Sequence, residues 1–357
     1  MRNNYKLTIL ILSFERQEEL KKKINYWNNI NDYKFKIIII DGSSKCLKIK
    51  IKNNKIKYYH FKSRDYHKRA FYALKHIKTE YFKLEAEDDY FLPSSLQSAI
   101  KFLDKNKNYS AVYGDAGIYS IYKNKLFINH IFKKRLNLNS NDFKKRLNTY
   151  FLNYSPKLYY SVMRTHLFKR NLDLWKSSKK NYGDKFQRFA EIHLPLILLL
   201  SGKVRVLNKI FWIRKDDDIQ NRVEFTSNKR LIKDDHTYTN ISKWFLKNSK
   251  KGYFDIFGNS LCNITKISNF NQNYIIYELL QKYFFIGIYK ANNNNKFINK
   301  MIKLIKYLLP SKFKKFLRFN LKLNGPALIK CDELKKELNI NYNFIDLKYL
   351  RTVLLKK

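Results

Sequence analysis

The acidic run Glu85-Ala86-Glu87-Asp88-Asp89 carries the clearest chemical signal in this sequence. It follows a strand-like segment, residues 81–86, and precedes Leu92-Pro93. In a chain with a formal net charge of +44, neighbouring carboxylates still repel one another unless a cation lies between them. A hard divalent cation prefers carboxylate oxygens and can also hold phosphate, so the run predicts a metal site. The alternative is a solvated acidic loop before the helix that starts near Pro93.

A second candidate follows the apolar segment 37–40, in the order Asp41-Gly42-Ser43-Ser44. An acid followed by glycine at the carboxyl end of a strand can reach a ribose or a base while the chain turns sharply. The alternative is an Asx turn, which this dipeptide makes readily.

A third candidate is Glu191, which lies among apolar residues in a helical pattern. Apolar surroundings raise the pKa of a carboxyl group, which suits a general base. A helix-surface acid paired with Arg188 or Lys185 is the alternative and would contribute little.

A fourth candidate is the basic segment 63–69, which contains Arg64, Lys68 and Arg69. Cations at the start of a helix can hold a diphosphate. A solvated basic face is the alternative interpretation.

These residues need elements that position them, and the first third of the chain supplies an alternating pattern. Strands are predicted at 7–12, 35–40, 56–61, 81–86 and 109–113, with helices at 16–28, 66–77 and after Pro93. Such alternation predicts a parallel sheet with helices on both faces. Ligands of open α/β sheets bind at the carboxyl ends of the strands, where both acidic candidates lie.

The pattern is less regular afterwards. We expect a strand at 159–164, a short helix through Leu167 and Phe168, a helix at 186–200 and one or two strands at 204–214. Beyond about residue 230 the composition shifts to Asn- and Lys-rich helices. An apolar stripe at 297–309 with lysines on the other side, continued at 313–318, suits an anionic membrane surface. Packing on the rest of the protein is the alternative.

Composition limits the class of protein. The chain has 357 residues and is 45% apolar, so it can bury a large core. Its three cysteines are far apart, which argues against a disulfide scaffold or structural zinc and fits a reducing cytosol. No apolar stretch is long enough to span a membrane, and the run at 7–12 reads as a buried strand rather than a signal peptide. The excess charge is spread along the chain, which we interpret mainly as compositional drift.

Taken together, the motifs resemble the GT-A-fold glycosyltransferases of family 2. The resemblance covers about residues 5–215. It is carried by the first strand with Ser13-Phe14-Glu15-Arg16, by Ile40-Asp41-Gly42-Ser43, by Lys68-Arg69-Ala70, by Glu87-Asp88-Asp89 with Leu92-Pro93, and by the spacing of Glu191 and Gly202 before Phe211-Trp212-Ile213-Arg214.

The chain departs from the family pattern in places. Glu87 stands first in the Asp-x-Asp position, and Ala190-Glu191 replaces the Glu-Asp pair, so Asp184 is a rival general base. No Gln-x-x-Arg-Trp occurs, so a processive polysaccharide synthase is not expected.

The resemblance implies a nucleotide-sugar donor. Asp41 would contact the nucleoside, with Ser13 nearby. Asp89, helped by Asp88 or Glu87, would hold Mn²⁺ or Mg²⁺ on the diphosphate, and Arg69 would add a second cation. Glu191 or Asp184 would deprotonate the acceptor hydroxyl, which implies inversion of the anomeric configuration.

The implied organisation is a catalytic domain at 1–230, with a donor half at 1–120 and an acceptor half at 121–230, followed by a helical basic region at 231–357. The resemblance implies a saccharide or lipid-linked acceptor, a role in cell-surface polysaccharide or lipopolysaccharide assembly, and a cytoplasmic location with optional contact to the inner membrane face. One rival is a sugar-phosphate nucleotidylyltransferase, but residues 13–16 lack its glycine-rich loop. Another is a non-catalytic nucleic-acid- or anion-binding protein, which predicts a localised basic stripe.

Overall fold

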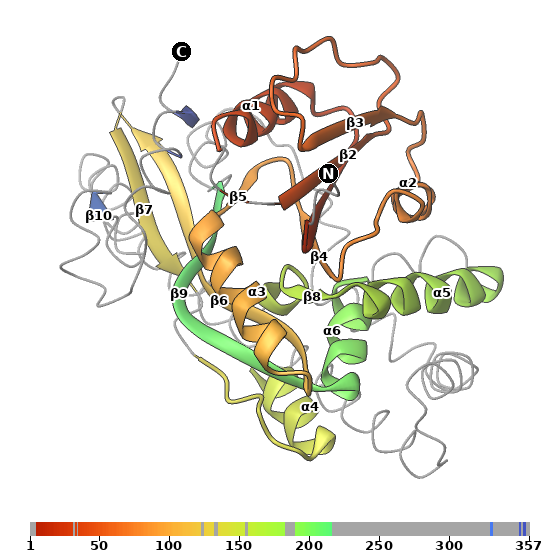
Figure 1. Cartoon of the computed structure of the whole chain (residues 1–357), viewed down its shortest axis with the longest axis vertical. Coiled ribbons are helices and arrows are strands. Elements are labelled where there is room, and N and C mark those ends of the chain that lie inside the picture. The colour runs from red at the N-terminus through yellow and green to blue at the C-terminus, as the bar shows by residue number, and fades with distance from the viewer. Residues whose placement is uncertain are drawn as a thin grey trace, which may run out of the picture.

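In the part of the chain that the structure describes, ten strands form a mixed sheet with helices on both faces (Figure 1). This computed structural model describes residues 5–30, 33, 35–122, 125–131, 135–153, 156–182 and 190–215, with short pieces at 329–330, 350 and 353–354. The main strand order is β10-β7-β6-β8-β4-β1-β2-β3, and β5 and β9 pair beside it. The predicted GT-A-like fold class, a mostly parallel sheet flanked by helices, is confirmed.

The parallel half of the sheet contains the first four strands. They are β1 (Leu7–Ser13), β2 (Phe35–Asp41), β3 (Ile56–His60) and β4 (Tyr81–Glu85), paired in parallel in the order β4-β1-β2-β3. Nearly every residue of β1, β2 and β4 is buried, as expected for strands covered on both faces. All four were predicted from the apolar runs.

Helices cover the two faces of this half. On one face, α1 (Gln17–Asn28) and α3 (Pro93–Lys105) contribute to a core that includes Ile9 and Ile39. On the other, α2 (Tyr66–Leu74) shares a core that includes Leu10 and Ile38 with three later helices, α4 (Phe143–Leu152), α5 (Thr165–Tyr182) and α6 (Ala190–Ser201). The neighbouring residues of one strand therefore bury their side chains in different cores, because strand side chains alternate between faces.

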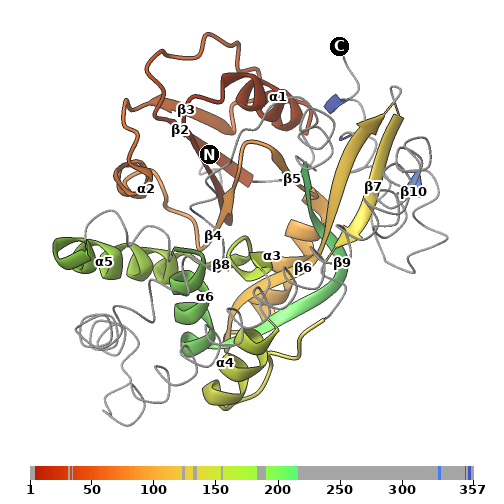
Figure 2. The same ribbon diagram turned by 180° about the vertical axis from the view of Figure 1, so that it is seen from behind.

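The other half of the sheet is built around two long strands. β6 (Tyr109–Tyr122) runs parallel to β9 (Lys203–Lys215) with irregular register between Tyr113 and Ala116. Four shorter antiparallel strands complete it, namely β5 (Asp89–Phe91), β7 (Lys125–Ile131), β8 (Val162–Arg164) and β10 (Ile329–Lys330). Of these, β8 joins the two halves between β4 and β6. Both ribbon views show β6 and β9 running together along the molecule (Figures 1 and 2).

Several predicted elements differ in extent. The strand expected at 159–164 is only Val162–Arg164, because a 3₁₀ turn, η1 (Pro156–Leu158), precedes it. The short helix through Leu167 is α5 (Thr165–Tyr182), 18 residues long, and the strands at 204–214 are the single strand β9. The helix at 186–200 is confirmed from Ala190 onward as α6 (Ala190–Ser201). The strands β5 (Asp89–Phe91) and β7 and the helix α4 (Phe143–Leu152) were not predicted.

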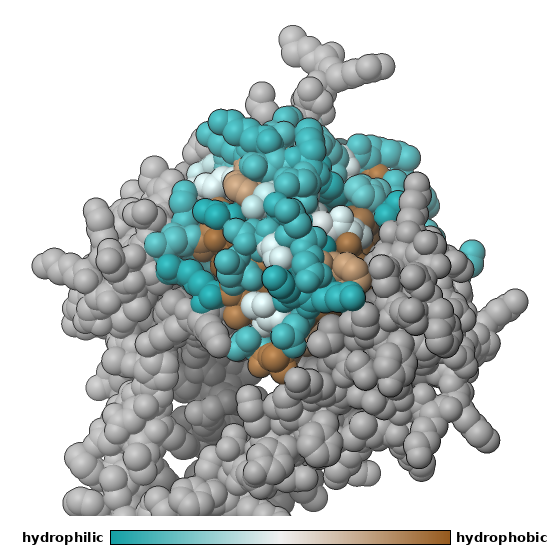
Figure 3. Space-filling model, turned by 90° about the horizontal axis from the view of Figure 1, so that it is seen from below, coloured by the Kyte–Doolittle hydropathy of each residue, from teal (hydrophilic) through white to brown (hydrophobic). Residues whose placement is uncertain are grey.

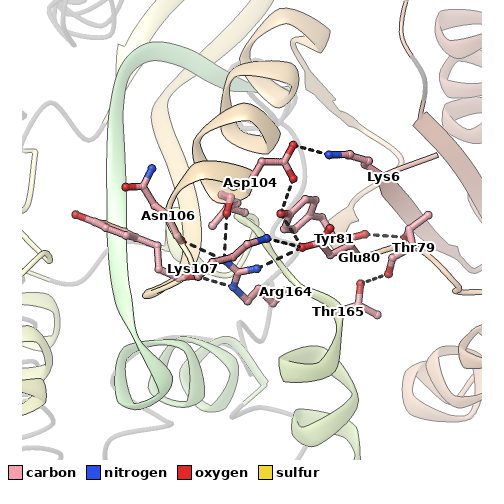
Figure 4. A network of polar contacts seen from close by, with 11 residues as sticks. Lys6, Thr79, Glu80, Tyr81, Asp104, Asn106, Lys107, Arg164 and Thr165 are labelled. Carbon is pink, nitrogen blue, oxygen red and sulfur yellow. Dashed lines mark hydrogen bonds and ion pairs between the residues drawn. The ribbon is translucent and has the colours of Figure 1, made fainter. Parts of the chain in front are cut away.

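A polar network ties β8 to the end of α3 (Figure 4). The Arg164 guanidinium donates hydrogen bonds to the carbonyl oxygens of Tyr109, Leu103 and Asn106. Asp104 accepts from Lys6 at 2.7 Å and from the Tyr81 hydroxyl at 2.8 Å. Lys6 and Tyr81 lie at the amino ends of β1 and β4, so this network joins elements at the edge of the sheet away from the acidic candidates.

The described surface is mainly polar on the face shown in Figure 3, with scattered hydrophobic residues. Within the described part of the chain, no helix is long and apolar enough to cross a membrane. The region 231–357, with the stripe at 297–318, lies outside the described residues apart from the short pieces given above.

Candidate active site

Ser13 and Asp41, the residues predicted to lie near the nucleoside, are side by side at the carboxyl edge of the sheet. Ser13 ends β1 and Asp41 ends β2, and they are register partners. The amide of Gly42 donates to the Ser13 carbonyl at 2.8 Å, which closes the two loops together. Because β1 has β2 on one side and β4 on the other, this edge is the switch point where open α/β sheets bind ligands.

The Asp41 carboxylate is fully buried and holds its own loop. Its Oδ1 accepts from the Ser43 amide at 2.9 Å, which is the Asx turn considered from the sequence, and its Oδ2 accepts from the Tyr58 hydroxyl at 2.7 Å. Burial and this hydrogen bond raise the pKa of Tyr58, so the phenol stays a donor. Both carboxylate oxygens of Asp41 therefore accept hydrogen bonds from within the protein, and a nucleoside contact by Asp41 stays a prediction.

Gly42 allows the basic segment to approach this loop. A Cβ on Gly42 would lie 2.2 Å from the Ser63 carbonyl oxygen and 2.6 Å from Nη1 of Arg69. Arg69 is 5% exposed and donates from Nη1 to the same carbonyl at 2.7 Å. The solvated basic face considered from the sequence therefore describes Arg64 and Lys68, which are exposed, but not Arg69.

Arg69 faces the acidic run. Burial lowers the pKa of its guanidinium, and Glu87 is the acid that opposes this most strongly. Among the described residues, Nε of Arg69 is buried without a hydrogen-bond partner. Burial raises the pKa of Glu87, and the nearby Ser13 hydroxyl is one of the groups that oppose this rise. The structure thus brings Ser13, Arg69 and Glu87 together from separate segments.

The acidic run divides into parts with different surroundings. Its first member, Glu85, forms a 2.7 Å ion pair with Lys23 of α1 and accepts from the Trp27 indole at 3.2 Å. Both charged side chains are 0% exposed. Sequence reasoning missed this pair, although Lys23 stands on the apolar face of α1 between Leu20 and Ile24, which was a usable signal.

Glu87 and Asp88 follow the end of β4 and turn toward one cation. Nη2 of Arg16 lies 2.8 Å from Asp88, and Nη1 lies 3.9 Å from Glu87. Burial raises the pKa of Glu87, and the nearby Arg16 charge opposes this shift. Arg16 precedes α1, so the loop after β1 supplies the cation and the loop after β4 supplies the carboxylates.

Asp89 lies inside the sheet instead. It begins β5, pairs with Arg214 of β9 and is 4% exposed. Burial, and then the charge of Asp88, raise its pKa to about 7, against the opposing charges of Lys23 and Arg214. Its assignment as a metal ligand stays a prediction.

The Glu87 and Asp88 pair fits a divalent cation held jointly with a ligand. Carboxylate oxygens suit Mg²⁺ and Mn²⁺, and both already converge on a positive group. No group of three or more His, Cys, Asp or Glu side chains arranged for a metal occurs in the described ranges. Oxygen atoms of water or of a bound diphosphate would complete the coordination.

Of the two candidates for the general base, the structure describes only the backbone of Glu191. The backbone of Glu191 lies in the first turn of α6, but its side chain, and all of Asp184, lie outside what the structure describes. His193 in the same turn is buried, and burial followed by the charge of His67 holds its pKa well below the ordinary value. His67, near the start of α2, stacks on Trp175 of α5 with ring centroids 3.2 Å apart. The helix of Glu191 thus packs near the helix that carries Arg69.

Comparison with known proteins relates the segment that contains this edge to a family of enzymes. Residues 8–168 match the glycosyl transferase family 2 model. Solved structures of TarS from S. aureus resemble the chain: TarS 1-349 at 14% identity and a TM-score of 0.40, covering 81% of this chain and 92% of that one, and its complex with UDP-GlcNAc at 12% identity and a TM-score of 0.39, with the same coverage. A longer TarS chain is covered over 55% of its length, at 14% identity and a TM-score of 0.36.

No curated protein matches this chain. The structural likenesses are too low to assign any residue, so the family model carries the identification. Its match includes Ser13, Asp41, Arg69 and the whole acidic run, and ends before Glu191. The segment 8–168 therefore matches glycosyl transferase family 2, and this match is the sequence pattern of a glycosyltransferase domain.

Proposed function

We propose that this protein transfers a sugar from a nucleotide-sugar donor to a hydroxyl group of a saccharide or lipid-linked acceptor, in a metal-dependent reaction that inverts the anomeric centre. The observation that supports this best is the convergence of Ser13, Asp41, Arg69, Glu87 and Asp88 at one carboxyl edge within a family-2 segment. Cations and carboxylates from four different loops meet where an α/β sheet binds its ligand.

The donor half divides the binding roles. The loops of Ser13 and Asp41 would hold the nucleoside, and Arg69 would pair with the diphosphate, since its Nε lacks a partner in the described structure. Glu87 and Asp88, with Asp89 behind them, would hold Mn²⁺ or Mg²⁺. A bound divalent cation would offset the negative charge that develops on the departing nucleoside diphosphate.

Transfer itself needs a base on the acceptor side. Glu191, or Asp184 in its place, would take the proton from the acceptor hydroxyl. The acceptor oxygen then forms a bond to the anomeric carbon as the bond from that carbon to the diphosphate oxygen breaks on the opposite face. One displacement inverts the configuration, by the same geometry as in inverting glycosidases.

The experiment is a metal-dependent donor assay. Purified protein is incubated with UDP-, GDP-, CDP- and dTDP-sugars with and without Mn²⁺, and release of nucleoside diphosphate is measured. We expect turnover with one donor class, and near-complete loss with Asp88→Asn or Glu191→Gln. Glu18→Gln, which removes an exposed acid from α1, is the matched control and should behave as wild type. Full turnover by both Asp88→Asn and Glu191→Gln would refute the assigned roles.

The acceptor and the place of action follow from the same proposal. A role in cell-surface polysaccharide or lipopolysaccharide assembly would bring the enzyme to the inner face of the cytoplasmic membrane, where the basic stripe at 297–318 would contact anionic lipid. Truncation after Asn295 should then release the protein from membranes. Identical fractionation of the truncated and full chains would contradict this anchor.

A further inference from the structure

The cation already bound to the proposed metal ligands is Arg16. Its guanidinium contacts Asp88 at 2.8 Å and approaches Glu87 to 3.9 Å. The Arg16 side chain is 39% exposed, whereas those of Glu87 and Asp88 are 9% and 15% exposed. The guanidinium therefore lies on the solvent side of the two carboxylates, where a ligand entering from solution would meet it first.

The backbone next to Arg16 is held in place by hydrogen bonds of its neighbour Glu15. Glu15 adopts φ 55°, a left-handed conformation that costs a non-glycine residue about 1 kcal/mol or more. Two hydrogen bonds fix it: its amide donates to the Ser43 hydroxyl at 2.8 Å, and its carboxylate accepts from the Ser44 amide at 2.7 Å. The first turn of α1 begins here, with the Leu20 amide donating to the Arg16 carbonyl at 3.0 Å.

The side chain of Arg16, by contrast, has no described hydrogen-bond or ion-pair partner apart from the two acids. Among the described residues, the two acids are therefore what holds the guanidinium in its observed position.

We propose that Arg16 is the resident counter-ion of Glu87 and Asp88, and that it transfers from these carboxylates to the diphosphate when a divalent cation binds. This inference rests on the proposed function. A guanidinium and a divalent cation cannot both sit between the same two carboxylates, so a metal arriving alone must break the Arg16 pair without compensation. A diphosphate supplies that compensation, because guanidinium groups pair well with phosphate oxygens.

The consequence is a coupling between two ligands. Metal alone binds weakly, diphosphate alone binds weakly, and each strengthens the other, as linkage requires. Removing the guanidinium should therefore have opposite effects on the two: the metal loses a competitor, and the diphosphate loses a partner. A residue with only a structural role would weaken both or neither.

The test is titration calorimetry on the full chain, comparing wild type with Arg16→Gln. The ligands are Mn²⁺ alone, and the tightest binder among UDP, GDP, CDP and dTDP in the presence of Mn²⁺. We expect Arg16→Gln to bind Mn²⁺ alone about fivefold more tightly, the size of one partly exposed ion pair, and the nucleoside diphosphate about tenfold more weakly. Arg16→Lys, which keeps the charge but loses the fork geometry, should lie between the two in both titrations.

Lys22→Gln removes the same charge from an exposed position on α1 and should match wild type. Unchanged or weaker Mn²⁺ binding by Arg16→Gln, in a wild-type protein that does bind the diphosphate, would overturn this proposal alone. Equal tightening by Lys22→Gln would also overturn it, because net charge would then explain the effect. Failure of wild type to bind any nucleoside diphosphate with Mn²⁺ would overturn the proposed function as well.

Discussion

The buried ion pair between Lys23 and Glu85 yields the sharpest stability prediction for this protein. It joins the middle of α1 to the last residue of β4, two residues before the proposed metal ligands. Lys23 also lies 4.1 Å from the ring centroid of Tyr90, and Glu85 accepts from the Trp27 indole. The perturbation is Lys23→Met, which keeps the volume of the side chain and removes its charge.

The magnitude follows from burial. Both side chains are 0% exposed, so Lys23→Met leaves a buried carboxylate whose remaining described donor is one indole nitrogen. Removing one partner of a buried pair costs about 3–5 kcal/mol. In a domain of this size that corresponds to a fall in melting temperature of about 10 °C. Replacing both partners, Lys23→Met with Glu85→Met, should restore stability to within about 2 kcal/mol of wild type.

Calorimetry and urea unfolding followed by tryptophan fluorescence measure both quantities. The matched control is Lys21→Met on the same helix, since Lys21 pairs with Glu18 at the same 2.7 Å but with side chains 42% and 75% exposed. It should unfold as wild type does, because water screens an exposed pair. The reasoning is refuted if Lys21→Met and Lys23→Met destabilise the protein equally. It is also refuted if the Lys23→Met/Glu85→Met variant loses as much stability as the single variants Lys23→Met and Glu85→Met lose when their losses are added.

Three further predictions concern other parts of the fold. Burial holds the pKa of Lys83 in the folded protein well below its ordinary value of 10.5. At a pH between the folded and the unfolded pKa, the unfolded chain binds a proton that the folded chain does not, so wild type should lose stability relative to Lys83→Met as the pH falls from about 10 to about 7. Urea unfolding midpoints measured at each pH test this. Gly42→Ala places a Cβ 2.2 Å from the Ser63 carbonyl oxygen and should cost about 1–3 kcal/mol while weakening nucleoside diphosphate binding at least tenfold, measured by thermal unfolding and calorimetry; an unchanged affinity would contradict the close approach of Arg69. Arg164→Met leaves carbonyl oxygens at the end of α3 with fewer donors and should lower stability by about 1–3 kcal/mol but leave nucleotide affinity unchanged, because the network lies at the other edge of the sheet.

Local pattern was enough to predict the part of the protein whose elements are set by short segments. The strands β1 to β4 and the helices between them follow from apolar runs and helical spacing, and parallel pairing then brings Ser13 and Asp41 to one edge. Asp41, the acidic run 85–89 and the basic segment of Arg69 were found from the sequence for the same reason. The antiparallel part was poorly predicted: β5 and β8 each have three residues, too few for a periodic signal, and exist because β9 and β6 lie beside them.

The sequence by itself determined that a cluster of carboxylates follows a buried strand at the ligand-binding edge of an α/β sheet. Only the tertiary structure decided what each carboxylate does. Glu85 meets Lys23 from 62 residues away, and Asp88 meets Arg16 from 72 residues away. Asp89 turns into the sheet opposite Arg214. The physical reason is that a carboxylate's charge state and partners depend on burial and on cations from distant segments, which no local pattern specifies.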